Sequence, residues 1–224
     1  CWGAKWQMFE PARLVSKKAG RYWDPNLGGA STQLATFKRN GNLSEDDWRE
    51  LFTACHSIGV QFVCSPFDLE AVDMLHSMGV KHYKLASGEI THEAMLRKVQ
   101  SVAAGTAADV ILSTGASTRD EIWRALDLLD GCRVTLLACA LSYPTLPGDA
   151  NLARIEALGG FPCPVGYSDH TLLTETALAA VAHGARLLEK HATLSSKGGV
   201  PDDRMALTPD RLAEYVRLAN LGVA

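Results

Sequence analysis

Short apolar runs alternate with longer amphipathic segments along almost the whole chain, and this alternation restricts the fold more than any other feature. The runs cover residues 4–9, 60–67, 82–87, 109–115, 133–140, 164–170 and 186–192. Strands that alternate with helices form a parallel sheet covered by helices. We therefore predict an α/β fold with seven recognisable parallel strands.

The segments between these runs carry the signals with which helices begin. Ser44 is suited to cap a helix, with Asp47 three positions later, and Thr118 with Glu121 has the pattern of a capping box. An apolar stripe at helical spacing follows each of the two caps. Residues 16–42 are instead rich in Gly, Asn, Ser and Lys, so we predict a long loop there.

An open doubly wound sheet and a (β/α)8 barrel both satisfy the alternation, and polar residues distinguish between them. Successive residues of a strand point to opposite faces, so Lys5 and Gln7 share one face and Lys84 lies opposite Leu85. In an open sheet both faces pack against helices, where an ammonium group is costly. A barrel instead builds its site at the carboxyl ends of the strands. We therefore predict a (β/α)8 TIM-type barrel.

Charge and cysteine content exclude several classes of function. The net charge of −3 over 224 residues gives no electrostatic reason to bind nucleic acid or an anionic membrane. No apolar run approaches the roughly 18 residues of a membrane span. The six cysteines include no C-x-x-C pair and are too sparse for a disulfide framework, which favours a cytoplasmic protein.

Two histidines, His170 and His191, stand at the ends of the last two apolar runs. Neighbouring strands of a barrel end side by side, so the two imidazoles can converge on one ion. Two such ligands leave coordination positions for water and substrate, as a catalytic metal requires. Asp169 and Glu189 are candidates to orient an imidazole ring. The spacing is equally compatible with two hydrogen-bonded core histidines.

Lys5 and Lys84 are predicted to point into the barrel, where an ammonium group requires an anionic partner. An interior carboxylate such as Glu89 or Glu189 is one possible partner. The other is an anionic substrate, because hydroxyl groups also stand at the strand ends and suit a phosphate or carboxylate. These hydroxyls belong to Ser87, Ser113, Thr114 and Ser168.

Two further residues near strand ends have both a structural and a functional interpretation. Glu89 can stabilise the start of the next helix, or it can bind substrate hydroxyls and move a proton. Tyr143, in the stretch SYPT, is either a packing residue of the rim or a substrate contact.

The stretches that carry these residues resemble the N-acetylneuraminate (sialic acid) synthase family. The matching stretches, in the family's order, are FVCSPFD, YKLASGEITH, ILSTGAST, SYPT, VGYSDHT, LEKHATL and PDD. The resemblance implies a single barrel domain over residues 1–224. It also implies condensation of phosphoenolpyruvate with N-acetylmannosamine or a related amino sugar, which yields a sialic-acid-like nonulosonic acid and phosphate. The implied cofactor is Mn or Mg, and the complete protein is expected to be a homodimer.

The resemblance implies a role for each matching residue. His170 and His191 match the metal ligands. The positions that hold phosphoenolpyruvate are matched by Lys5, Lys84, Ser87, Ser113 and Ser168. The positions around the sugar are matched by Gln7, Glu89, Tyr143 and Asp202. We expect Lys84 and Glu89 to take part in catalysis.

The sequence departs from the family's usual pattern in several places. The family has a first strand ending in a glutamate and a small C-terminal antifreeze-like domain, and we expect both to be absent from this chain. Ala138 and Asp203 replace usual histidines, and Leu141 replaces a small polar residue. Two alternatives therefore remain: condensation of phosphoenolpyruvate with a different sugar, or a barrel that binds a ligand without catalysis.

Overall fold

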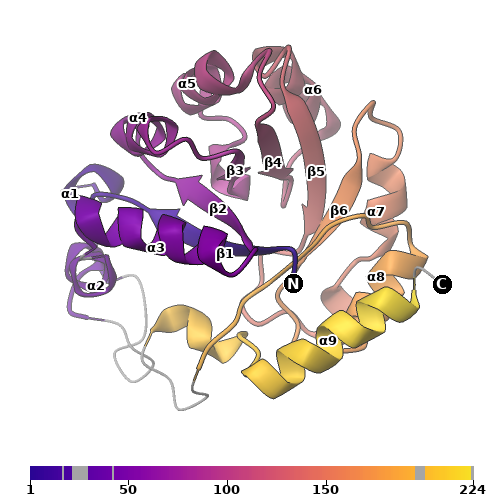
Figure 1. Cartoon of the computed structure of the whole chain (residues 1–224). Helices are drawn as coiled ribbons and strands as arrows, with labels where there is room; N and C mark the ends of the chain where they lie inside the picture. The colour runs from indigo at the N-terminus through magenta and orange to yellow at the C-terminus, as the bar shows by residue number, and fades with distance from the viewer. Residues whose placement is uncertain (17, 22–29, 42, 195–199, 223–224) are drawn as a thin grey trace. The chain divides into compact units, whose positions relative to one another are not determined.

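The fold is the predicted alternation of strands and helices (Figure 1). The computed structural model describes residues 1–16, 18–21, 30–41, 43–194 and 200–222. The strands are β1 (Gly3–Met8), β2 (Gln61–Pro66), β3 (His82–Leu85), β4 (Asp109–Ser113), β5 (Arg133–Cys139), β6 (Val165–Asp169) and β7 (Leu188–Lys190). The helices are α1 (Pro11–Leu14), α2 (Gln33–Asn40), α3 (Glu45–Ser57), α4 (Leu69–Ser77), α5 (Glu93–Ala103), α6 (Arg119–Leu128), α7 (Ala153–Leu158), α8 (Thr176–Ala182) and α9 (Pro209–Leu221). Single 3-10 turns are η2 (Ser87–Glu89), η3 (Pro147–Asp149) and η4 (Pro201–Arg204).

The strand order in the parallel sheet follows the chain, from β1 to β7. This confirms the predicted α/β fold. The chain forms two compact units, which are described separately below. The first unit comprises residues 1–112 and 118–134, and the second comprises residues 113–117 and 135–224. Among the described residues, no helix has the length and apolar character needed to cross a bilayer.

In the first unit, strand alternation separates apolar from polar side chains. Cys64 of β2 pairs with Tyr83 of β3, which pairs with Val110 of β4, and all three are almost completely buried. Helices α3 and α4 pack against β2 (Figure 1). Lys84 follows Tyr83 in β3, and Gln7 of β1 pairs with the residue that follows Cys64 in β2. Gln7 and Lys84 therefore lie on the opposite face, as the sequence pattern predicts.

Helix starts follow the local signals of the sequence in two places and depart from them in one. Both predicted caps form capping boxes, at Ser44 before α3 and at Thr118 before α6. The prediction of a loop over 16–42 is wrong for α2, which Thr32 caps by accepting a hydrogen bond from the amide of Ala35. Residues 17, 22–29 and 42 of the same stretch lie outside the described part of the chain.

In the second unit, β5, β6 and β7 pair in parallel, and α8 lies beside α9 (Figure 1). Cys139 pairs with Ser168, and Ser168 pairs with Glu189, so these three side chains share one face. A small apolar core under the two helices contains Ala177, Leu207 and Tyr215. The unit therefore brings the carboxyl ends of β5, β6 and β7 to one side.

Candidate functional site

Strands β6 and β7 end beside each other, and each is followed by a predicted metal ligand. The last residues of the two strands, Asp169 and Lys190, are register partners. The rings of His170 and His191 follow directly, with centroids 5.6 Å apart and planes inclined by 48°. This separation is compatible with one divalent ion bound to a nitrogen of each ring at about 2.0–2.3 Å.

The second ring nitrogen of His170 is already engaged. Its Nδ1 lies 2.8 Å from the carbonyl oxygen of Ala140, which can only accept, so Nδ1 carries the proton and Nε2 is the acceptor nitrogen. Histidines that bind metals usually donate their other N–H in this way. Burial lowers the pKa of His170, which favours the neutral ring that a metal requires. The geometry of His170 therefore fits a metal ligand.

Two residues expected around the sugar flank the histidine pair. The ring of Tyr143, in the loop after β5, lies 4.2 Å from that of His170, measured between centroids. Asp202, in η4, places Oδ2 3.5 Å from Nδ1 of His191, and its side chain is about half exposed. Among the described residues, no cluster of three or more His, Cys, Asp or Glu side chains is arranged to hold a metal. The two imidazoles remain the predicted metal ligands of this site.

The residues predicted to hold phosphoenolpyruvate are distributed over both units. In the first unit, Lys84 is almost fully buried, and its Nζ donates to the carbonyl oxygen of Leu85 over 2.9 Å. Lys5 lies on the same face of the sheet, in β1, which β2 separates from β3. Ser87 lies in η2, the turn that follows β3 directly.

Glu89 closes the same turn. Its Oε2 lies 2.7 Å from Nδ1 of His92, and its side chain is 15% exposed. Glu89 is therefore mostly buried at the carboxyl end of β3, before the first turn of α5. This position agrees with either of its two interpretations.

In the second unit, Ser113 and Ser168 are both buried at strand ends. The loop 113–117 that begins at Ser113 is held by a residue that the sequence did not indicate. Arg154 of α7 donates to the carbonyl oxygens of Thr114 and Ser117, over 2.6 and 2.9 Å. Arg154 acts through backbone carbonyls about 40 positions away, so no local pattern identifies it.

Comparison with known proteins identifies the family. Residues 2–221 match the family model described as NeuB family. The chain belongs to the NeuB family. This agrees with the resemblance to sialic acid synthases that its motifs show.

Relatives of this NeuB-family chain include a protein named as a synthase. The chain is 36% identical over 216 residues to the N,N'-diacetyllegionaminic acid synthase of Campylobacter jejuni, covering 93% of this chain and 63% of that protein. It is 39% identical over 216 residues to an uncharacterized protein of Methanocaldococcus jannaschii, covering 95% and 59%. The chain thus spans about three fifths of the length of these curated relatives.

A solved structure shows the same fold. The N-acetylneuraminic acid (sialic acid) synthetase of Leptospira borgpetersenii, in complex with citrate, superposes with a TM-score of 0.86 at 26% identity. The match covers 99% of this NeuB-family chain and 73% of that protein.

One expectation for this NeuB-family site needs correction. The sequence suggests Asp169 as a residue that orients an imidazole, but Asp169 forms an ion pair with Lys190, with Nζ 3.0 Å from Oδ2. The carbonyl oxygen of Ala140 engages His170 instead. Glu189 lies on the face of Ser168, and its charge acts on His170 by raising the pKa, against the larger effect of burial.

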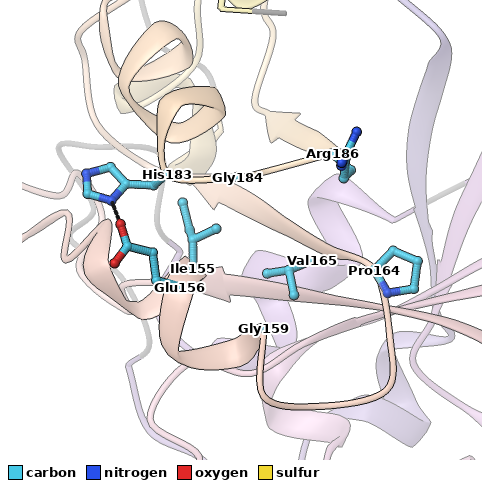
Figure 2. A pocket seen from close by; sticks show the side chains of 8 residues that line it. All are labelled: Ile155, Glu156, Gly159, Pro164, Val165, His183, Gly184 and Arg186. Atoms are coloured by element: carbon cyan, nitrogen blue, oxygen red, sulfur yellow. Dashed lines mark hydrogen bonds and ion pairs between the residues drawn. The ribbon is translucent and has the colours of Figure 1, made fainter.

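A pocket of about 570 Å³ opens at the other end of the same strands (Figure 2). Its lining residues are Ile155, Glu156, Gly159, Pro164, Val165, His183, Gly184 and Arg186. Pro164 and Val165 stand at the amino end of β6, whereas His170 follows its carboxyl end. At one side of the pocket, Nδ1 of His183 lies 2.7 Å from Oε1 of Glu156 (Figure 2). None of the predicted site residues lines this pocket.

Proposed function

We propose that the complete protein condenses phosphoenolpyruvate with N-acetylmannosamine or a related amino sugar, releasing phosphate and forming a nonulosonic acid. The observation that carries the proposal is the arrangement of His170 and His191, with ring centroids 5.6 Å apart and Nδ1 of His170 bonded to Ala140. The named relative and the solved structure support this reaction class, since both are synthases of such acids by name.

A divalent ion, Mn or Mg, is proposed as the cofactor, with His170 and His191 as its protein ligands. When bound, such an ion supplies Lewis acidity for a sugar aldehyde. The resemblance assigns the remaining roles to the side chains of this chain. Tyr143 and Asp202 are assigned to the sugar, and their proximity to the two histidines supports this. Gln7 is assigned to the sugar by the resemblance alone.

Phosphoenolpyruvate carries a phosphate and a carboxylate, and the proposal assigns both to cationic and hydroxyl donors. The ammonium groups of Lys5 and Lys84 bind these anions and stabilise the charge that develops on them. Hydrogen bonds come from the hydroxyls of Ser87, Ser113 and Ser168. Glu89, mostly buried beside His92, binds sugar hydroxyls or moves a proton.

We further propose that the strands belong to a (β/α)8 barrel and that the complete protein is a cytoplasmic homodimer. The alternation of parallel strands with helices supports the barrel, and both predicted metal ligands directly follow the carboxyl ends of strands, where barrels build their sites. The sparse cysteines support a cytoplasmic location.

The test is phosphate release by the complete protein from phosphoenolpyruvate with a panel of acceptors. The panel contains N-acetylmannosamine, a diacetamido-trideoxyhexose and an aldose phosphate, each with Mn²⁺, with Mg²⁺ and with a chelator. We expect release only when an amino sugar and a divalent ion are both present. Release with the aldose phosphate alone identifies a different condensation. Phosphoenolpyruvate binding without turnover on any sugar identifies a ligand-binding barrel.

A further inference from the structure

A buried ion pair joins the two residues that immediately precede His170 and His191. Nζ of Lys190 lies 3.0 Å from Oδ2 of Asp169, and the two side chains are 3% and 0% exposed. Asp169 and Lys190 are also register partners across β6 and β7. The pair therefore ties the two strands together at the point where each histidine leaves its strand.

Further hydrogen bonds extend this link around His170. The backbone N–H of Thr171 donates to Oδ1 of Asp169 over 2.8 Å, and Nζ of Lys190 donates to the carbonyl oxygen of Thr171. The residue before His170 is thus a member of the ion pair, and the residue after it is hydrogen-bonded to both members. Because its two chain neighbours are held, the backbone of His170 is fixed relative to β7.

The ion pair lies on the opposite face of these strands from Ser168, which is assigned to the substrate. Ser168 and Glu189 share one face, so Asp169 and Lys190 share the other. Nζ of Lys190 lies 5.5 Å from the centroid of the Tyr215 ring of α9, and Tyr215 is itself buried. The pair therefore acts on the histidines mainly through the backbone, and its two opposite charges act on the pKa of His170 in opposite directions.

The stability of the fold alone does not explain why charged residues occupy positions 169 and 190. Burying two opposite charges costs desolvation, and a well-packed apolar pair of similar volume is often equally stable or more so. An ion pair with fixed hydrogen bonds instead sets the relative position of two backbones. We infer that the Asp169–Lys190 pair is a positioning element that sets the separation of His170 and His191 for divalent metal binding. The inference rests on the proposed function, since it takes these histidines as ligands.

The test uses the complete protein with the double substitution Asp169→Leu/Lys190→Met, which removes both charges and keeps an apolar pair. The dissociation constant for Mn²⁺ is measured by calorimetry without substrates, and thermal unfolding is measured without metal. We expect an unfolding temperature close to that of the unchanged protein but Mn²⁺ binding weakened by about tenfold or more, as for other groups that hold metal ligands in place. Glu156→Gln, which removes the ion pair with His183 at the other end of these strands, is the matched control and should leave Mn²⁺ binding unchanged.

The outcomes separate the inference from the proposed function. Unchanged Mn²⁺ affinity in the folded double variant would overturn the inference and leave the metal site standing. Absence of Mn²⁺ binding in the unchanged protein would overturn the metal site, and the inference with it. If the double variant does not fold, Lys190→Arg replaces it, because its larger planar group must displace the end of β7 to fit the same buried space. Weaker Mn²⁺ binding by folded Lys190→Arg supports the inference, and unchanged binding overturns it.

Discussion

The Nδ1–H of His170 donates to the carbonyl oxygen of Ala140 over 2.8 Å, which leaves Nε2 as the nitrogen for a metal. The ring of His191 lies 5.6 Å away, between centroids. The two rings are therefore close enough for one divalent ion to bind a nitrogen of each.

We expect His170→Ala and His191→Ala each to abolish metal-dependent turnover in the complete protein. Each removes one of two imidazole ligands at the ends of the strands. In the His170 variant the fold also loses the hydrogen bond to Ala140, worth about 1–3 kcal/mol where a buried carbonyl loses its partner. Calorimetric titration with Mn²⁺ and circular dichroism check the two parts. His56→Ala, on the exposed surface of α3, is the control. Mn²⁺ affinity equal to that of the control in both variants would falsify the assignment.

Replacement of Lys84 should affect phosphoenolpyruvate rather than the metal. Lys84→Met removes an almost fully buried ammonium group that we assign to the substrate anion. A hydrogen bond to a charged group contributes about 1.5–3 kcal/mol, so we expect the dissociation constant of phosphoenolpyruvate to rise by about tenfold or more. Mn²⁺ binding should persist. Lys98→Met, which removes a surface ion pair with Asp73, is the control, and an equal effect of both variants contradicts the assignment.

Arg154→Met should loosen the loop that begins at Ser113. Both hydrogen bonds from Arg154 to the carbonyl oxygens of Thr114 and Ser117 are lost, and we expect the free energy of unfolding to fall by about 1–3 kcal/mol. Phosphoenolpyruvate should also bind more weakly, because Ser113 is less well placed. Chemical denaturation and phosphoenolpyruvate titration measure the two effects. Arg124→Met, at an exposed position of α6, should change neither quantity.

Gly166 has no room for a side chain, and Gly166→Ala should destabilise the second unit. A Cβ at this position would overlap the carbonyl oxygen of Leu187 and the side chain of Leu137. Overpacking of this kind costs about 1–3 kcal/mol. The free energy of unfolding in urea measures the loss. Gly148→Ala, where a Cβ meets nothing within 4 Å, is the control, and equal stability of the two variants contradicts this prediction.

His82 should make the stability of the first unit depend on pH. The ring of His82 is buried, with Nδ1 3.1 Å from Oδ2 of Asp109. Burial lowers the pKa of His82 below 6.5, and the Asp109 carboxylate opposes this only in part. As the pH falls below 6.5, the unfolded chain therefore binds a proton before the folded chain does, and stability falls. The free energy of unfolding of His82→Gln should lose part of this pH dependence; an identical slope in both proteins contradicts the prediction.

Much of the fold follows from local sequence patterns. The apolar runs correspond to β1–β7, and the capping boxes at Ser44 and Thr118 form as predicted, because capping joins residues three positions apart. Strand alternation likewise places Lys5 and Gln7 on one face of their strand, and Lys84 opposite Leu85 in another, without any knowledge of the neighbouring strands. The position of both histidines after a strand was equally visible in the sequence.

Only the tertiary structure decided which groups hold the site residues in place. Nδ1 of His170 is engaged by a backbone carbonyl, which every residue carries and which therefore has no sequence signature. Strand register brings Lys190 next to Asp169, and Arg154 donates to the 113–117 loop from α7. Such partners depend on how distant segments pack. The sequence by itself therefore determined the strands and the candidate ligands, whereas the packing determined what orients them.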